Sequence, residues 1–153
     1  MPFFRRRRRK EVVEAKAPVE GAPTPARERL ASLTARLAGI VERLASLTGI
    51  SMVMLMGRGG ENIYRWYRTT ADMRRIRIST RDVLDLVLRA SDLMSKTSTT
   101  VLDDVIMRTG DRVAVLQAAG PLYLVVIADR AANLALLLVR SKAAAREIAG
   151  LVG

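Results

Sequence analysis

The chain has 153 residues, half of them hydrophobic, which is enough for one globular domain with a buried core. It contains no cysteine and no histidine, so it lacks disulfides, thiolate chemistry, the commonest general base and the commonest metal ligand. An enzyme is therefore disfavoured, we expect no cofactor, and the formal net charge of +11 directs attention to polyanionic partners.

Residues 1–25 have the composition of an interaction tail. Two phenylalanines and six consecutive basic residues open it: Phe3, Phe4, Arg5, Arg6, Arg7, Arg8, Arg9 and Lys10. A block of like charges repels itself and cannot be buried, so we expect a disordered tail that ends in a proline-rich linker. Such a tail suits an anionic membrane surface, and it equally suits non-specific binding to RNA or DNA. A solvated, solubilising end is the third alternative.

The sequence does not predict a membrane-spanning segment. Its apolar runs, such as residues 134–139 with alanines before them, are far below the roughly 20 residues that cross a bilayer. The arginines near the start are followed by Glu11 and not by an apolar block, which argues against a signal peptide. We expect a cytoplasmic protein that is peripheral at the membrane if its tail binds lipid.

The first folded elements are a helix and two strands. Over residues 26–47, leucines and a valine recur every three or four positions, which predicts an amphipathic helix packed on a sheet. The apolar run 50–56 predicts a central strand covered on both faces, with three methionines that fill a core. The glycine turn 57–60 then leads to a second strand over residues 63–68.

The second strand interleaves Trp66 and two tyrosines with Arg65 and Arg68. This pairing occurs where proteins stack on nucleic-acid bases. It also occurs in edge strands, where charged side chains discourage further pairing. We favour the edge strand.

A basic connection over 71–79 precedes a middle helix over residues 81–96, for which Thr80 is the expected N-cap. Six apolar side chains form the arc that we expect to face the sheet: Val83, Leu86, Val87, Ala90, Leu93 and Met94. Leu84 and Leu88 widen the arc beyond what one sheet face can cover. In a domain of this size, the expected second cover is another copy of the chain.

The last part of the chain predicts a meander of three strands followed by a helix. Short apolar, β-branched runs at 101–107, 113–116 and 122–127 are separated by turns that contain glycine. The helix is expected over residues 134–152, with Asn133 as its N-cap.

This order of elements resembles the roadblock / dynein light-chain domain family. The resemblance covers residues 27–152 and rests on the segments 47–56, 120–127 and 133–137. It implies an α+β domain over residues 26–153. In such a domain, a five-stranded antiparallel sheet has the first and last helices on one face and the middle helix on the other. The chain departs from the family at Met56, where an acidic residue is frequent, and in its cationic tail.

The resemblance also implies a dimer, because family members pack their middle helices together and join their edge strands into one continuous sheet. On this chain it places the interface on Leu84, Val87, Leu88, Ser91 and Ser95 of the middle helix, and on Val101, Asp103, Val105 and Met107 of the edge strand. This agrees with the over-wide apolar arc.

Family members commonly serve as non-catalytic partners of small Ras-like GTPases, as activators or scaffolds, and others are motor light chains. No GTPase motif occurs in the chain, so the partner would bind the nucleotide. We therefore expect a dimeric regulatory or scaffolding module, paired with itself or with a related roadblock chain. The alternative is a nucleic-acid-binding protein that acts through residues 3–10.

Overall fold

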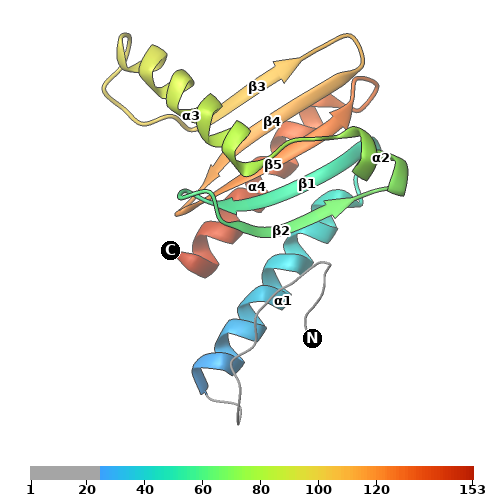
Figure 1. Ribbon diagram of the computed structural model, residues 1–153, viewed down its shortest axis with the longest axis vertical. Helices are drawn as coiled ribbons and strands as arrows, with labels where there is room; N and C mark the ends of the chain where they lie inside the picture. The colour runs from blue at the N-terminus through green and yellow to red at the C-terminus, as the bar shows by residue number, and fades with distance from the viewer. Residues whose placement is uncertain (1–24) are drawn as a thin grey trace, which may run out of the picture.

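The computed structural model describes residues 25–153. They form a five-stranded antiparallel sheet, in the order β2-β1-β5-β4-β3, with helices on both faces (Figure 1). In chain order the elements are α1 (Pro25–Ala45), β1 (Ile50–Gly57), β2 (Asn62–Tyr67), α2 (Thr70–Arg75), α3 (Thr80–Ser95), β3 (Asp104–Arg108), β4 (Arg112–Ala119), β5 (Leu122–Asp129) and α4 (Leu134–Val152). This confirms the predicted sheet, and it places β2 and β3 at its two edges.

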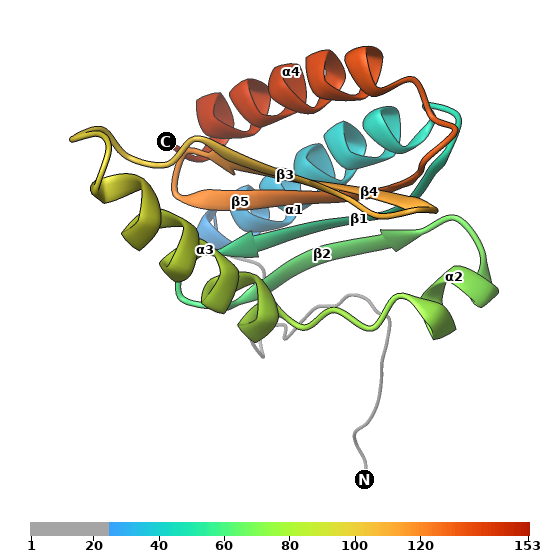
Figure 2. The same cartoon turned by 90° about the horizontal axis from the view of Figure 1, so that it is seen from above.

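The sheet separates two layers of helices (Figure 2). Helices α1 and α4 lie side by side on one face, and α3 lies on the other face together with the short α2. Each layer has its own apolar cluster, with Val41 and Leu137 in the first and Val83 and Val87 in the second. None of the described helices is both long enough and apolar enough to cross a membrane.

The central strand β1 is buried on both faces, as its unbroken apolar sequence predicts. Met52 and Met54 point into the cluster under α3, whereas Val53 and Leu55 point into the cluster under α1 and α4. Because side chains alternate along a strand, one apolar run supplies both layers. The methionines fill a core, as expected.

Helices α3 and α4 begin at side-chain caps. The amide oxygen of Asn133 accepts the backbone N–H of Leu136 at 3.0 Å, as predicted for α4. For α3 the cap is Ser79, one residue before the expected Thr80. The Ser79 hydroxyl accepts the N–H of Asp82 at 3.1 Å, and the Asp82 carboxylate accepts the N–H of Ser79 at 2.9 Å. This reciprocal pair satisfies two backbone donors that the helix itself cannot.

Two elements differ from the sequence prediction. Residues 70–75, expected to be an irregular connection, form α2, whose start is fixed by the Thr69 hydroxyl accepting the N–H of Asp72 at 3.0 Å. Strand β3 begins at Asp104 and not at residue 101, so Val101 lies in the loop before it.

Helix α1 extends past the sheet. All of its buried residues lie in its second half, from Leu37 to Ala45. Its first half projects beyond the sheet in Figure 1, and Leu30 is 64% exposed. The predicted stripe is therefore fully buried only from Leu37 onward, and Leu33 is half-buried against the core, because the first part of α1 has no sheet beneath it (Figure 1).

Candidate interaction surface

Helix α3 exposes several large apolar side chains. Val83 and Val87 are buried against the sheet, whereas Leu88 is 68% exposed and Leu93 is 64% exposed. Met94 is also exposed. The expectation that Leu93 and Met94 face the core is wrong, because the second half of α3 has less sheet beneath it. The helix thus offers three large apolar side chains to a second molecule.

Strand β3 adds apolar side chains at the adjacent edge of the sheet. Among the strands of residues 25–153 it pairs only with β4, and both Ile106 and Met107 are exposed. Met107 lies opposite Ala114, on the α3 face, whereas Ile106 lies opposite Val115, whose side chain belongs to the cluster under α4. We call these five exposed residues the α3–β3 surface: Leu88, Leu93, Met94, Ile106 and Met107.

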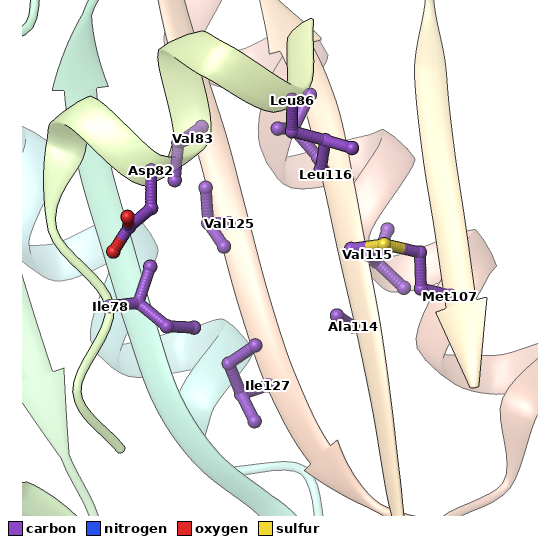
Figure 3. A pocket seen from close by; sticks show the side chains of 10 residues that line it. All are labelled: Ile78, Asp82, Val83, Leu86, Met107, Ala114, Val115, Leu116, Val125 and Ile127. Atoms are coloured by element: carbon purple, nitrogen blue, oxygen red, sulfur yellow. The ribbon is translucent and has the colours of Figure 1, made fainter. Parts of the chain in front are cut away.

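An apolar groove of about 220 Å³ lies between α3 and the sheet (Figure 3). Its floor is formed by residues of β4 and β5, its helix side by Val83 and Leu86, and its outer side by Met107 of the α3–β3 surface. Asp82 is its only acidic lining residue, and the hydrogen bonds from Ser79 hold the pKa of that carboxyl below its usual range. The groove is therefore apolar, with one ionised carboxylate at its side.

The structure distributes the predicted interface residues unequally. Ser95, Val101, Asp103 and Met107 are exposed, Leu88 is 68% exposed, and Leu84, Ser91 and Val105 are half-buried. Val87 is only 8% exposed and packs in the chain's own core, so we leave it out of the surface. The predicted interface did not include Ile106, because the resemblance placed it on the odd-numbered residues Val101, Asp103, Val105 and Met107. An edge strand, however, exposes side chains on both faces.

The aromatic and arginine side chains of β2 are engaged within the fold. Arg68 donates to the backbone carbonyls of Ile50, Ala45 and Leu47 at 2.6, 2.8 and 3.1 Å. Its guanidinium also lies over the ring of Trp66, 5.2 Å from the centroid, and Trp66 packs on the cluster under α1. β2 is thus an edge strand, as favoured, and Arg68, directly after it, links the end of α1 to the start of β1.

Arg58, in the glycine turn after β1, is also engaged. It donates to the carbonyl of Gly120 at 2.7 and 3.1 Å and to the hydroxyl of Tyr123 at 3.1 Å. Its guanidinium lies 4.6 Å from the centre of the Tyr123 ring. The contacts tie the β1–β2 turn to the β4–β5 turn, so this arginine has a structural role.

The predicted polyanion or membrane contact, residues 3–10, lies outside the described residues. Within residues 25–153, no three acidic side chains come together in a way that could hold a metal ion.

Comparison with known proteins identifies the fold. Neither a protein-family model nor a curated protein sequence matches the chain. Among solved structures, the gliding protein MglB from Thermus thermophilus is similar, with a TM-score of 0.67 at 16% identity over 91% of this chain and 97% of that one. MglB from Myxococcus xanthus has a TM-score of 0.64 at 20% identity, over 78% and 92% of the two chains.

A Roadblock/LC7 domain from Streptomyces avermitilis is also similar, with a TM-score of 0.57 at 16% identity over 72% of this chain and 89% of that one. At such identities the likeness concerns the fold. Together the three structures confirm a roadblock-like fold over most of the chain.

Proposed function

We propose that this roadblock-like domain forms a homodimer through the α3–β3 surface and acts as a non-catalytic regulator or scaffold of a small Ras-like GTPase. The observation that carries the dimer is the set of exposed apolar side chains on α3 and β3, at one edge of the sheet. A small GTPase is the partner that the resemblance to the roadblock family implies, and the roadblock-like fold, found also in MglB, supports it.

The apolar side chains of α3 favour a protein partner over solvent. Burying one leucine side chain contributes about 1.5–3 kcal/mol. In a two-fold dimer each residue is buried twice, so Leu88 and Leu93 together supply several kcal/mol toward association. This offsets part of the cost of lost rotational and translational freedom, about 4–15 kcal/mol, and the remaining contacts of the interface must supply the rest.

The described residues offer binding surfaces and no reaction centre. The chain has neither cysteine nor histidine, and among the described serines and threonines only Thr109 donates its hydroxyl to a carboxylate, that of Asp111. This hydrogen bond closes the turn between β3 and β4. A regulator that binds its partner fits these features better than an enzyme does.

The proposal includes a role for the basic tail. Its six consecutive cationic residues, 5–10, would hold the dimer at an anionic membrane surface, where each basic residue contributes about 1 kcal/mol. The phenylalanines at positions 3 and 4 are suited to enter the membrane interface.

Leu88→Glu tests the dimer. It places a charge in the proposed interface and should convert the protein to a monomer in analytical ultracentrifugation, without loss of helical circular dichroism. Leu30→Glu is a matched control, since Leu30 is 64% exposed but lies on the projecting half of α1. A Leu88→Glu protein that stays fully dimeric would remove the proposed interface.

The GTPase role is tested by binding. Small Ras-like GTPases from the same cell are titrated against the full chain, each loaded with GDP or with a non-hydrolysable GTP analogue. We expect one of them to bind with an affinity that depends on its nucleotide, and Leu88→Glu to change that binding. Equal or absent binding for every GTPase and nucleotide would contradict this half of the proposal.

A further inference from the structure

Strand β3 presents a defined set of backbone groups at its free edge. The N–H of Ala118 donates to the carbonyl of Asp103 at 2.8 Å, and the N–H of Thr109 donates to the carbonyl of Arg112 at 2.9 Å. Backbone groups of an antiparallel strand point alternately to its two sides. Odd-numbered residues from 103 to 109 therefore bond to β4. Even-numbered residues direct their N–H and C=O groups outward.

The outward-facing residues are Asp104, Ile106 and Arg108, and their side chains share the α4 face of the sheet. Ile106 lies opposite Val115, and Arg108 lies opposite Val113, and both valines belong to the cluster under α4. Asp104 and Arg108 are about 13 Å apart along the strand, too far to pair with each other. Neither side chain makes a hydrogen bond or ion pair within residues 25–153.

We infer that a second copy of the chain pairs with β3 antiparallel in one register, with Ile106 opposite Ile106 of the other copy. This inference rests on the proposed homodimer and adds its alignment. In that register Asp104 of each copy lies opposite Arg108 of the other. The three outward-facing residues of each strand then form hydrogen-bonded pairs, and two cross-strand ion pairs flank a central apolar contact.

Other registers are poorer on the same grounds. A slip by one residue would set outward-facing backbone groups against residues already bonded to β4. A slip by two residues puts each charge opposite an uncharged residue. A slip by four residues sets Asp104 against Asp104 in one direction, or Arg108 against Arg108 in the other. The charges at the two ends of β3 therefore select one alignment.

The same arrangement explains why the partner should be an identical chain. Directly opposed strands share their faces, so the two α4 layers fall on one side of the joined sheet and the two α3 helices on the other. The exposed Leu88 and Leu93 of both copies are then on the same side. A strand without opposite charges at its two ends would leave Asp104 and Arg108 unpaired.

A charge-swap experiment on the full chain tests the register. Asp104→Arg and Arg108→Asp each replace both ion pairs by like-charge contacts. Opposite-charge pairs strengthen and like-charge pairs weaken such contacts, by up to about thirtyfold for two pairs. We expect each variant alone to dimerise at least tenfold more weakly than the wild type. An equimolar mixture should form a heterodimer of near wild-type affinity, because the arginine introduced into one chain would then face the aspartate introduced into the other.

Controls separate this outcome from a general charge effect. Glu28→Arg on α1 and Arg140→Asp on α4 make the same charge changes at exposed sites away from β3, and their mixture should gain nothing. If the wild type dimerises but the β3 variants dimerise as tightly as it does, or gain nothing on mixing, the register is wrong and the dimer stands. A monomeric wild type overturns the homodimer and the register with it.

Cysteine cross-linking gives a second, direct measurement in a chain that has no cysteine of its own. Residues in a hydrogen-bonded antiparallel pair have Cα atoms about 5.5 Å apart, which suits a disulfide. Ile106→Cys should therefore cross-link to itself under mild oxidation. Val139→Cys, at a more exposed position on α4, should not. Equal cross-linking of the two variants would refute the register.

Discussion

Arg68→Met tests the structural role given to the arginine at the end of β2. The guanidinium of Arg68 binds three backbone carbonyls, those of Ala45, Leu47 and Ile50, where α1 ends and β1 begins. Hydrogen bonds from a charged donor contribute about 1.5–3 kcal/mol each when desolvated. Arg68 is itself exposed, so water can replace part of each bond. We expect the variant to lose about 2 kcal/mol of unfolding free energy in total.

The assay is urea unfolding followed by circular dichroism, at one protein concentration for every variant because a dimer's stability depends on concentration. Arg65→Met is the matched control. Arg65 lies on the same strand but binds only side chains, Asn62 and Tyr67, both at 3.2 Å. Its loss should cost less than about 0.5 kcal/mol. Equal losses for the two variants would show that the carbonyl contacts of Arg68 do not hold α1 to β1.

Two further predictions concern one turn and one tyrosine. Gly120→Ala should lower the free energy of unfolding by about 1–3 kcal/mol in the same assay, because Gly120 has a φ of +63° and an added Cβ would lie 3.2 Å from the Cα of Ala149. Gly110→Ala is the control and should cost far less, because a Cβ at position 110 would meet open space. Burial and a hydrogen bond to Glu42 raise the pKa of Tyr64 to about 12. The contribution of Tyr64 to the free energy of unfolding should therefore be complete below about pH 10 and be lost as the pH rises toward 12. An ultraviolet titration checks the tyrosine: the last tyrosine of the wild type to ionise should be missing from Tyr64→Phe. If it is still present, the raised pKa does not belong to Tyr64.

The sheet could be predicted because its signals are local. Short apolar, β-branched runs and the glycine turns between them place all five strands within a few residues, and the Asn133 cap is read directly from its side-chain type. The short α2 was not predicted, because six residues are too few to show a helical period. Its one signal was the Thr69 to Asp72 spacing of a capped helix start.

The extent of each helix over the sheet could not be predicted. Periodicity shows which residues share a face, but not where the sheet beneath that face ends. Leu30 of α1 and Leu93 of α3 continue their apolar stripes without a break, yet both are exposed because their helices run past the sheet. The interaction surface could therefore be recognised through Leu88, the residue that widens the arc. Its extension to Leu93 and Ile106 needed the three-dimensional structure.

The molar mass of the full chain in solution tests the central claim most directly. Light scattering coupled to size-exclusion chromatography, at micromolar concentration and in moderate salt to screen the basic tail, reports it independently of shape. We expect the molar mass of a homodimer, which is twice the chain's 16.8 kDa. A single species of 16.8 kDa would contradict it, and would mean that the apolar side chains of α3 and β3 serve a different partner.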